Sequence, residues 1–146
     1  MDHNLVFHLA NALVLPAWIA LITRPSWRFG SDVLAPIITP GAMALLYVPY
    51  IAAALGDGTG GFGSLEELSL AFSTEIGVMA GWAHYLVADV FLGSWALRES
   101  QRLGIRHRTM IPILIGFLML MPVGFLAYLV VRAKRTGWSI TAGRGA

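Results

Sequence analysis

The chain has 146 residues, of which none is cysteine and only 12% are charged. The absence of cysteine excludes disulfide bonds, thiolate nucleophiles and cysteine-ligated metals. A soluble domain of this length would need more charge to cover its surface. The sequence also lacks a nucleophile elbow, a glycine-rich phosphate loop after a strand and a His-x-x-x-His pair. We therefore predict no metal site and none of the common hydrolase or nucleotide-binding chemistries.

The residues that are present are mostly apolar: 57% are hydrophobic, and the mean hydropathy is +0.70. They gather in four stretches, residues 5–22, 33–55, 71–97 and 110–131, each about as long as a helix that crosses a bilayer. We expect an all-α integral membrane protein whose residues 1–135 form one compact bundle of four transmembrane helices. Residues 136–146 would form a short polar tail. The expected location is a bacterial inner membrane, with lipids as neighbours.

The distribution of charge indicates an orientation rather than a partner. The formal net charge is +2, and the basic residues lie at the ends of apolar stretches, where they anchor helices, so no nucleic-acid partner is predicted. If all four stretches cross, two loops on one side carry six arginines and the other side carries four basic residues: Arg24, Arg28, Arg98, Arg102, Arg106 and Arg108 against Arg132, Lys134, Arg135 and Arg144. This count favours both termini outside the cytoplasm.

Ionisable residues are concentrated in the third stretch. Glu75, Trp82 and Asp89 recur every seven residues and so share one stripe of a helix, whereas His84 lies on another. A carboxylate in hydrocarbon costs about 2.5–3.5 kcal/mol on insertion scales, and no lysine or arginine lies within a stretch to pair it. Either these groups form a functional site, or a buried His–Asp or His–Glu pair holds the helices together without chemistry.

Two further patterns indicate packing between helices. His8, Asn11 and Trp18 share one face of the first stretch, where they would either contact a ligand or hydrogen-bond another helix. Gly77 and Gly81 allow a neighbouring helix to approach closely.

A haem held by His8 and His84 is a third possibility for these polar groups. The two histidines would lie on helices that run in the same direction. His84 is about nine residues further along its stretch, which is roughly 13 Å deeper in the membrane. Axial haem ligands need nearly equal depth, so a haem is disfavoured and no cofactor is predicted.

The block from Trp82 through His84, Tyr85 and Asp89 to Gly93 resembles the signature helix of the abscisic-acid-deficient-four-like family. These are small polytopic membrane proteins whose plant members are implicated in neoxanthin synthesis. The resemblance extends to Asn11, Pro16 and Trp18 in the first stretch and to Pro122, Gly124 and Tyr128 in the last. It implies a role in carotenoid metabolism, with the conversion of an epoxide to an allene as the family reaction.

Such an isomerisation is redox-neutral and needs an acid and a base. A carboxylic acid buried in hydrocarbon stays neutral and can donate a proton, while a neutral imidazole can accept one. We expect Asp89 and Glu75 as acids and His84 as the base. Trp82 and Tyr85, together with His8, Asn11 and Trp18, are the expected substrate-binding residues. A homodimer, or a partner carotenoid enzyme, would help to enclose a long carotenoid or other isoprenoid. The alternative is a pigment-binding or assembly subunit without catalysis.

Overall fold

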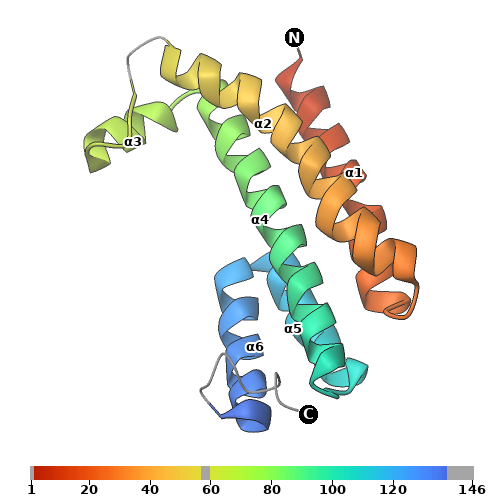
Figure 1. Ribbon diagram of the computed structural model, residues 1–146. Helices are drawn as coiled ribbons and strands as arrows, with labels where there is room; N and C mark the ends of the chain where they lie inside the picture. Colours follow the sequence, from red (N-terminus) through yellow and green to blue (C-terminus); the bar gives the residue numbers. More distant parts are fainter. Residues whose placement is uncertain (1, 57–59, 138–146) are drawn as a thin grey trace.

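In a computed structural model, which describes residues 2–56 and 60–137, the chain is helical and contains no strands (Figure 1). This confirms the all-α fold. Along the chain the elements are α1 (His3–Thr23), η1 (Gly30–Ile38), α2 (Thr39–Gly56), α3 (Leu65–Ala71), α4 (Glu75–Arg102), α5 (His107–Met119) and α6 (Met121–Thr136).

Three of the four predicted spans are confirmed as helices long and apolar enough to cross a membrane: α1, the continuous η1–α2 rod, and α4. Asp2 caps α1 by accepting hydrogen bonds from the backbone N–H groups of Asn4 and Leu5, at 3.0 and 3.2 Å. The η1 segment is a π-helix that contains Pro36. Because proline cannot donate to the carbonyl one turn earlier, the regular α-helical pattern is interrupted there.

The chain between α2 and α4 contains a short extra helix, α3, that lies almost entirely outside the four predicted stretches. Ser64 caps α3 by accepting from the N–H of Glu67 at 3.1 Å, and the Glu67 carboxylate accepts from the N–H of Gly63 at 3.0 Å. A second cap, Thr74, then opens α4 by accepting from the N–H of Gly77 at 3.0 Å. The third span therefore begins at Glu75 and not at residue 71.

The predicted fourth span, residues 110–131, is wrong: these residues form a helical hairpin instead of one crossing helix. The helices α5 and α6 meet at Leu120, whose φ of −148° and ψ of 79° leave the helical region. Pro122 lies in the first turn of α6, where no intrahelical N–H is needed, whereas within one continuous helix its ring would clash with the carbonyl of Leu118. A Cβ on Gly124 would meet the backbone of Gly116 and Phe117, so only glycine allows the two helices to close this tightly.

The hairpin reaches only part of the way across the bundle. The 13 residues of α5 span about 20 Å, less than the roughly 30 Å of a hydrocarbon core. In Figure 1, α5 runs back along α4, and α6 then returns to the end of the bundle where α4 ends. The ends of α4 and α6 consequently lie on one side, opposite the start of α1. In the predicted four-span arrangement, the start of α1 and the end of the last helix would instead share a side. Most of the expected tail, residues 138–146, lies outside the described residues.

The central helix of the bundle is α4, which packs against α1, η1, α2 and α5 (Figure 1). As expected, α1 and α4 run in the same direction. At Gly93 the two helices pack tightly, because the ring of Trp18 lies at the position a Cβ would occupy. Large apolar side chains from all the long elements fill the core, among them Trp18, Leu21, Met43, Leu97 and Phe117.

Candidate functional site

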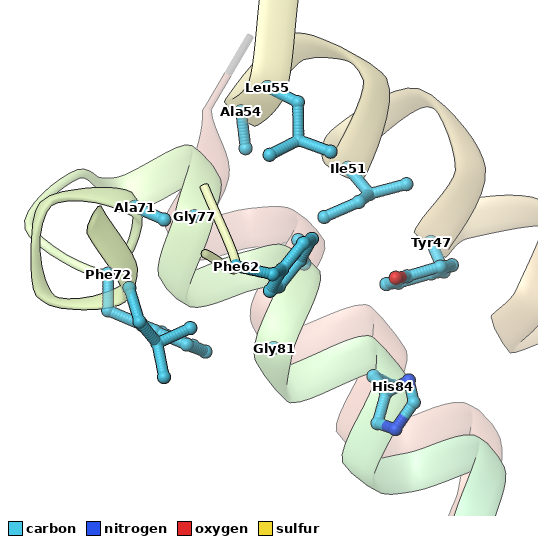
Figure 2. Close-up of a pocket in the computed structure, with 12 residues that line it drawn as sticks. Tyr47, Ile51, Ala54, Leu55, Phe62, Ala71, Phe72, Gly77, Gly81 and His84 are labelled. Atoms are coloured by element: carbon cyan, nitrogen blue, oxygen red, sulfur yellow. The ribbon is translucent and has the colours of Figure 1, made fainter. Parts of the chain in front are cut away.

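A cavity of about 400 Å³ lies between α2, α3 and α4, at the end of the bundle away from the hairpin (Figure 2). Its volume is within the range of small-molecule sites. Its walls are mainly apolar and aromatic: Tyr47, Ile51, Ala54 and Leu55 from α2, Phe62, Leu68, Ala71 and Phe72 from α3 and its flanking segments, and Gly77, Ala80, Gly81 and His84 from α4.

Two glycines of α4 shape one wall. A Cβ on Gly77 would overlap the carbonyl of Ala71, and a Cβ on Gly81 would overlap the ring of Phe72. The close approach predicted for Gly77 and Gly81 therefore takes place, but the element that approaches is the segment just before α4 rather than another long helix. This contact keeps Phe72 in the lining of the cavity (Figure 2).

His84 lies at one end of the cavity lining, about nine residues and roughly 13 Å along α4 from Glu75, and its side chain is exposed. Its ring faces the ring of Tyr47 on α2, with centroids 5.7 Å apart and planes inclined by 55° (Figure 2). Imidazole is the side chain that exchanges protons most readily near neutral pH. One proton-exchanging group and one phenol thus lie side by side in the lining of a mainly apolar cavity.

The two predicted acids lie elsewhere. Asp89 is only 1% exposed and is one of the buried side chains of α4, but it is not among the residues that line the cavity. Glu75 is the first residue of α4 and is exposed. The structure does not bring His84, Asp89 and Glu75 together around this cavity.

Asp89 lies beside the hydroxyl of Tyr85, at the turn of the α5–α6 hairpin. The Tyr85 hydroxyl donates a hydrogen bond of 3.1 Å to the carbonyl of Met119, the last residue of α5, and lies beside the backbone N–H of Met121, the first residue of α6. One phenol thus contacts a backbone group on each side of the break at Leu120. Atom Oδ1 of Asp89 is buried without a hydrogen-bond partner among the described residues.

Three of the other predicted substrate-binding residues, Asn11, Trp18 and Trp82, lie at the contact between α1 and α4. The indole N–H of Trp82 donates to the side-chain oxygen of Asn11 at 3.1 Å, and Trp18 is buried against Gly93. The ring of Trp82 also stacks on that of Tyr85, with centroids 5.5 Å apart. His8 is exposed, with its ring against Phe7. None of these predicted residues is among those that line the cavity.

Sequence reasoning missed the cavity's aromatic wall, which is formed by Tyr47, Phe62 and Phe72. Aromatic residues in an apolar stretch or beside it are equally typical of lipid-facing positions, so composition alone does not identify them. The available signal was Gly77 and Gly81, which lie on the same stretch as His84. Small residues at these positions leave room for a bulky neighbouring side chain.

Taken together, the fold and the cavity define a small polytopic α-helical protein of the membrane with a mainly apolar cavity between its helices. The sequence profile of the ABA4-like (ABA DEFICIENT 4-like) family matches residues 5–128, which include every helix that lines the cavity. The chain belongs to this family. Comparisons with curated proteins and with solved structures gave no match.

Proposed function

We propose that the protein binds a carotenoid-type isoprenoid in the cavity between α2, α3 and α4 and isomerises its oxygenated end group. The observation that carries this proposal is the position of His84, beside the ring of Tyr47, in the lining of a mainly apolar cavity. An apolar ring can fill the cavity, and the imidazole can meet an oxygen of such an end group. Membership of the ABA4-like family supports the choice of an isoprenoid ligand.

The proposed reaction converts an epoxide to an allene without oxidation or reduction. A proton is delivered to the epoxide oxygen as its carbon–oxygen bond breaks, and a proton leaves a neighbouring carbon of the polyene as the new double bond forms. His84 removes the carbon-bound proton. We assign proton delivery to the hydroxyl of Tyr47, whose ring lies 5.7 Å from that of His84, in preference to Asp89 and Glu75, which do not line the cavity.

A second candidate function is pigment binding without catalysis. It is favoured by the separation of His84 from both carboxylates, which leaves the cavity without the carboxylic acid that the sequence predicted. In this case His84 would only hydrogen-bond the oxygen of the ligand.

Pigment profiles of a carotenoid-producing host separate these functions. We expect the wild-type protein to change the profile, and the variants His84→Ala and Tyr47→Phe to lose this change while remaining in the membrane. Asp89→Asn and Glu75→Gln test the alternative acids. Phe91→Ala is the matched control, because Phe91 is an exposed residue of α4 that does not line the cavity.

Each outcome selects a function. Product formation by His84→Ala would refute the isomerase. Loss of product only in Asp89→Asn would show that Asp89, at the hairpin turn, delivers the proton in place of Tyr47. Pigment that purifies with the wild-type protein but is never converted would establish the binding subunit. If neither pigment nor conversion depends on the cavity variants, the cavity is not the site.

A further inference from the structure

The basic residues of the chain are gathered at one end of the bundle. Among the described residues, nine lysines and arginines lie at this end: Arg24, Arg28, Arg98, Arg102, Arg106, Arg108, Arg132, Lys134 and Arg135. The only acidic side chains with them there, within the described ranges, are Asp32 and Glu99. This end is therefore strongly positive, and we call these nine residues the basic rim.

The hairpin is what makes the rim continuous. Had residues 110–131 crossed the membrane, the last three basic residues would lie at the opposite end. Instead, Arg132 forms an ion pair of 3.7 Å with Glu99 of α4. The loop after α1 is joined to the same surface, because Gln101 donates to the carbonyl of Pro25 at 2.8 Å and a ring nitrogen of His107 lies 2.8 Å from the carbonyl of Ile22.

The opposite end has the opposite charge. Its described ionised side chains are all acidic: Asp2, Glu66, Glu67 and Glu75. The cavity is at this end as well, bounded by the last turns of α2 and by α3 (Figures 1 and 2). Phe62, which lines the cavity, is 68% exposed, so the wall on this side borders lipid or the interface.

We propose that the basic rim docks on the anionic phospholipid headgroups of the cytoplasmic leaflet, and that the cavity therefore opens in the opposite leaflet, from which its lipophilic ligand enters. Arginine and lysine near the ends of spans are retained on the cytoplasmic side, whose leaflet is negatively charged. With nine basic residues at one end and none described at the other, the orientation is determined. The entry of a ligand rests on the proposed function, whereas the orientation does not.

The natural absence of cysteine allows a direct test on the full-length protein. Single cysteines at Glu66, Ser26 and Lys134, all exposed, are treated with a membrane-impermeant maleimide on spheroplasts before and after permeabilisation. We expect Glu66→Cys to be labelled equally in both conditions. Ser26→Cys and Lys134→Cys should be labelled only after permeabilisation.

Labelling of Ser26→Cys on intact spheroplasts would overturn the orientation, and labelling of Lys134→Cys together with Glu66→Cys would overturn the hairpin. The role of the headgroups is tested by adding Arg24→Gln, Arg28→Gln and Arg106→Gln to the Glu66→Cys variant. Partial protection of Glu66→Cys, indicating mixed orientations, supports docking through charge; unchanged labelling refutes it. None of these results depends on a pigment, so they remain informative if the proposed isomerase fails.

Discussion

The hydroxyl of Tyr85 offers the sharpest test of the hairpin. The change is Tyr85→Phe, which removes one oxygen and keeps the ring that stacks on Trp82. In the structure this oxygen donates to the Met119 carbonyl at 3.1 Å and lies beside the N–H of Met121. In lipid no water replaces these contacts, because the break lies within an apolar region.

The size of the effect follows from two bounds. Interhelical hydrogen bonds in membranes contribute about 0.6 kcal/mol on average and up to about 1.7. This contact is on the exposed surface of the bundle, where lipid takes the place of water, and a polar group without a partner in an apolar medium costs about 1–3 kcal/mol. Since one phenol serves both sides of the break, we expect Tyr85→Phe to lower the free energy of unfolding by about 1–2 kcal/mol.

Tyr128→Phe is the matched control. The Tyr128 side chain is completely buried, yet its hydroxyl has no hydrogen-bond partner among the described residues. Removing that hydroxyl should leave stability unchanged within about 0.5 kcal/mol, or raise it slightly. Reversible unfolding of the purified protein in mixed micelles with increasing denaturing detergent, followed by tryptophan fluorescence, measures both variants. Equal stabilities for the two variants would refute the assigned role of Tyr85.

Two other predictions concern contacts of α4. Replacing Asn11 by Leu and Trp82 by Phe, singly and together, should give a coupling energy of about 0.6–1 kcal/mol in the same unfolding assay, and no coupling would mean that their hydrogen bond is not formed. Gly77→Ala should lower the thermal stability because its Cβ would overlap the Ala71 carbonyl. Gly41→Ala, where nothing lies within 4 Å, should instead stabilise α2 by up to about 1 kcal/mol; a shift of both glycine variants in the same direction would contradict the packing described.

Hydropathy predicted the three complete spans because each is both long and apolar. Length and apolar character can be read directly from consecutive residues of the sequence. It failed for the fourth because a hairpin of two short apolar helices has the same composition as one long helix. The relevant information was local: Pro122 two residues after Leu120, and glycines at 116 and 124 on either side of it. Only the folded chain shows that these glycines face each other.

The candidate site was predicted in part. His84 was chosen because an ionisable group in an apolar stretch needs a reason, and it does line the cavity. Asp89 was chosen on the same ground, but helical periodicity already placed it on a different face, and the structure keeps it there. The partners of His84 could not be predicted, because Tyr47 and Phe72 reach it from elements whose relative positions depend on the tertiary fold.

The hairpin also gives the molecule an uneven cross-section. One half of the bundle contains α1, α2 and α4 with the short α3 beside them, whereas the half nearer the basic rim also contains the longer helices α5 and α6 (Figure 1). Such a shape is a wedge: it displaces more lipid area from one leaflet than from the other. Many copies in one patch would occupy different areas in the two leaflets and would therefore bend the bilayer. The protein is thus expected to settle preferentially where the membrane is already curved in the sense that matches its taper.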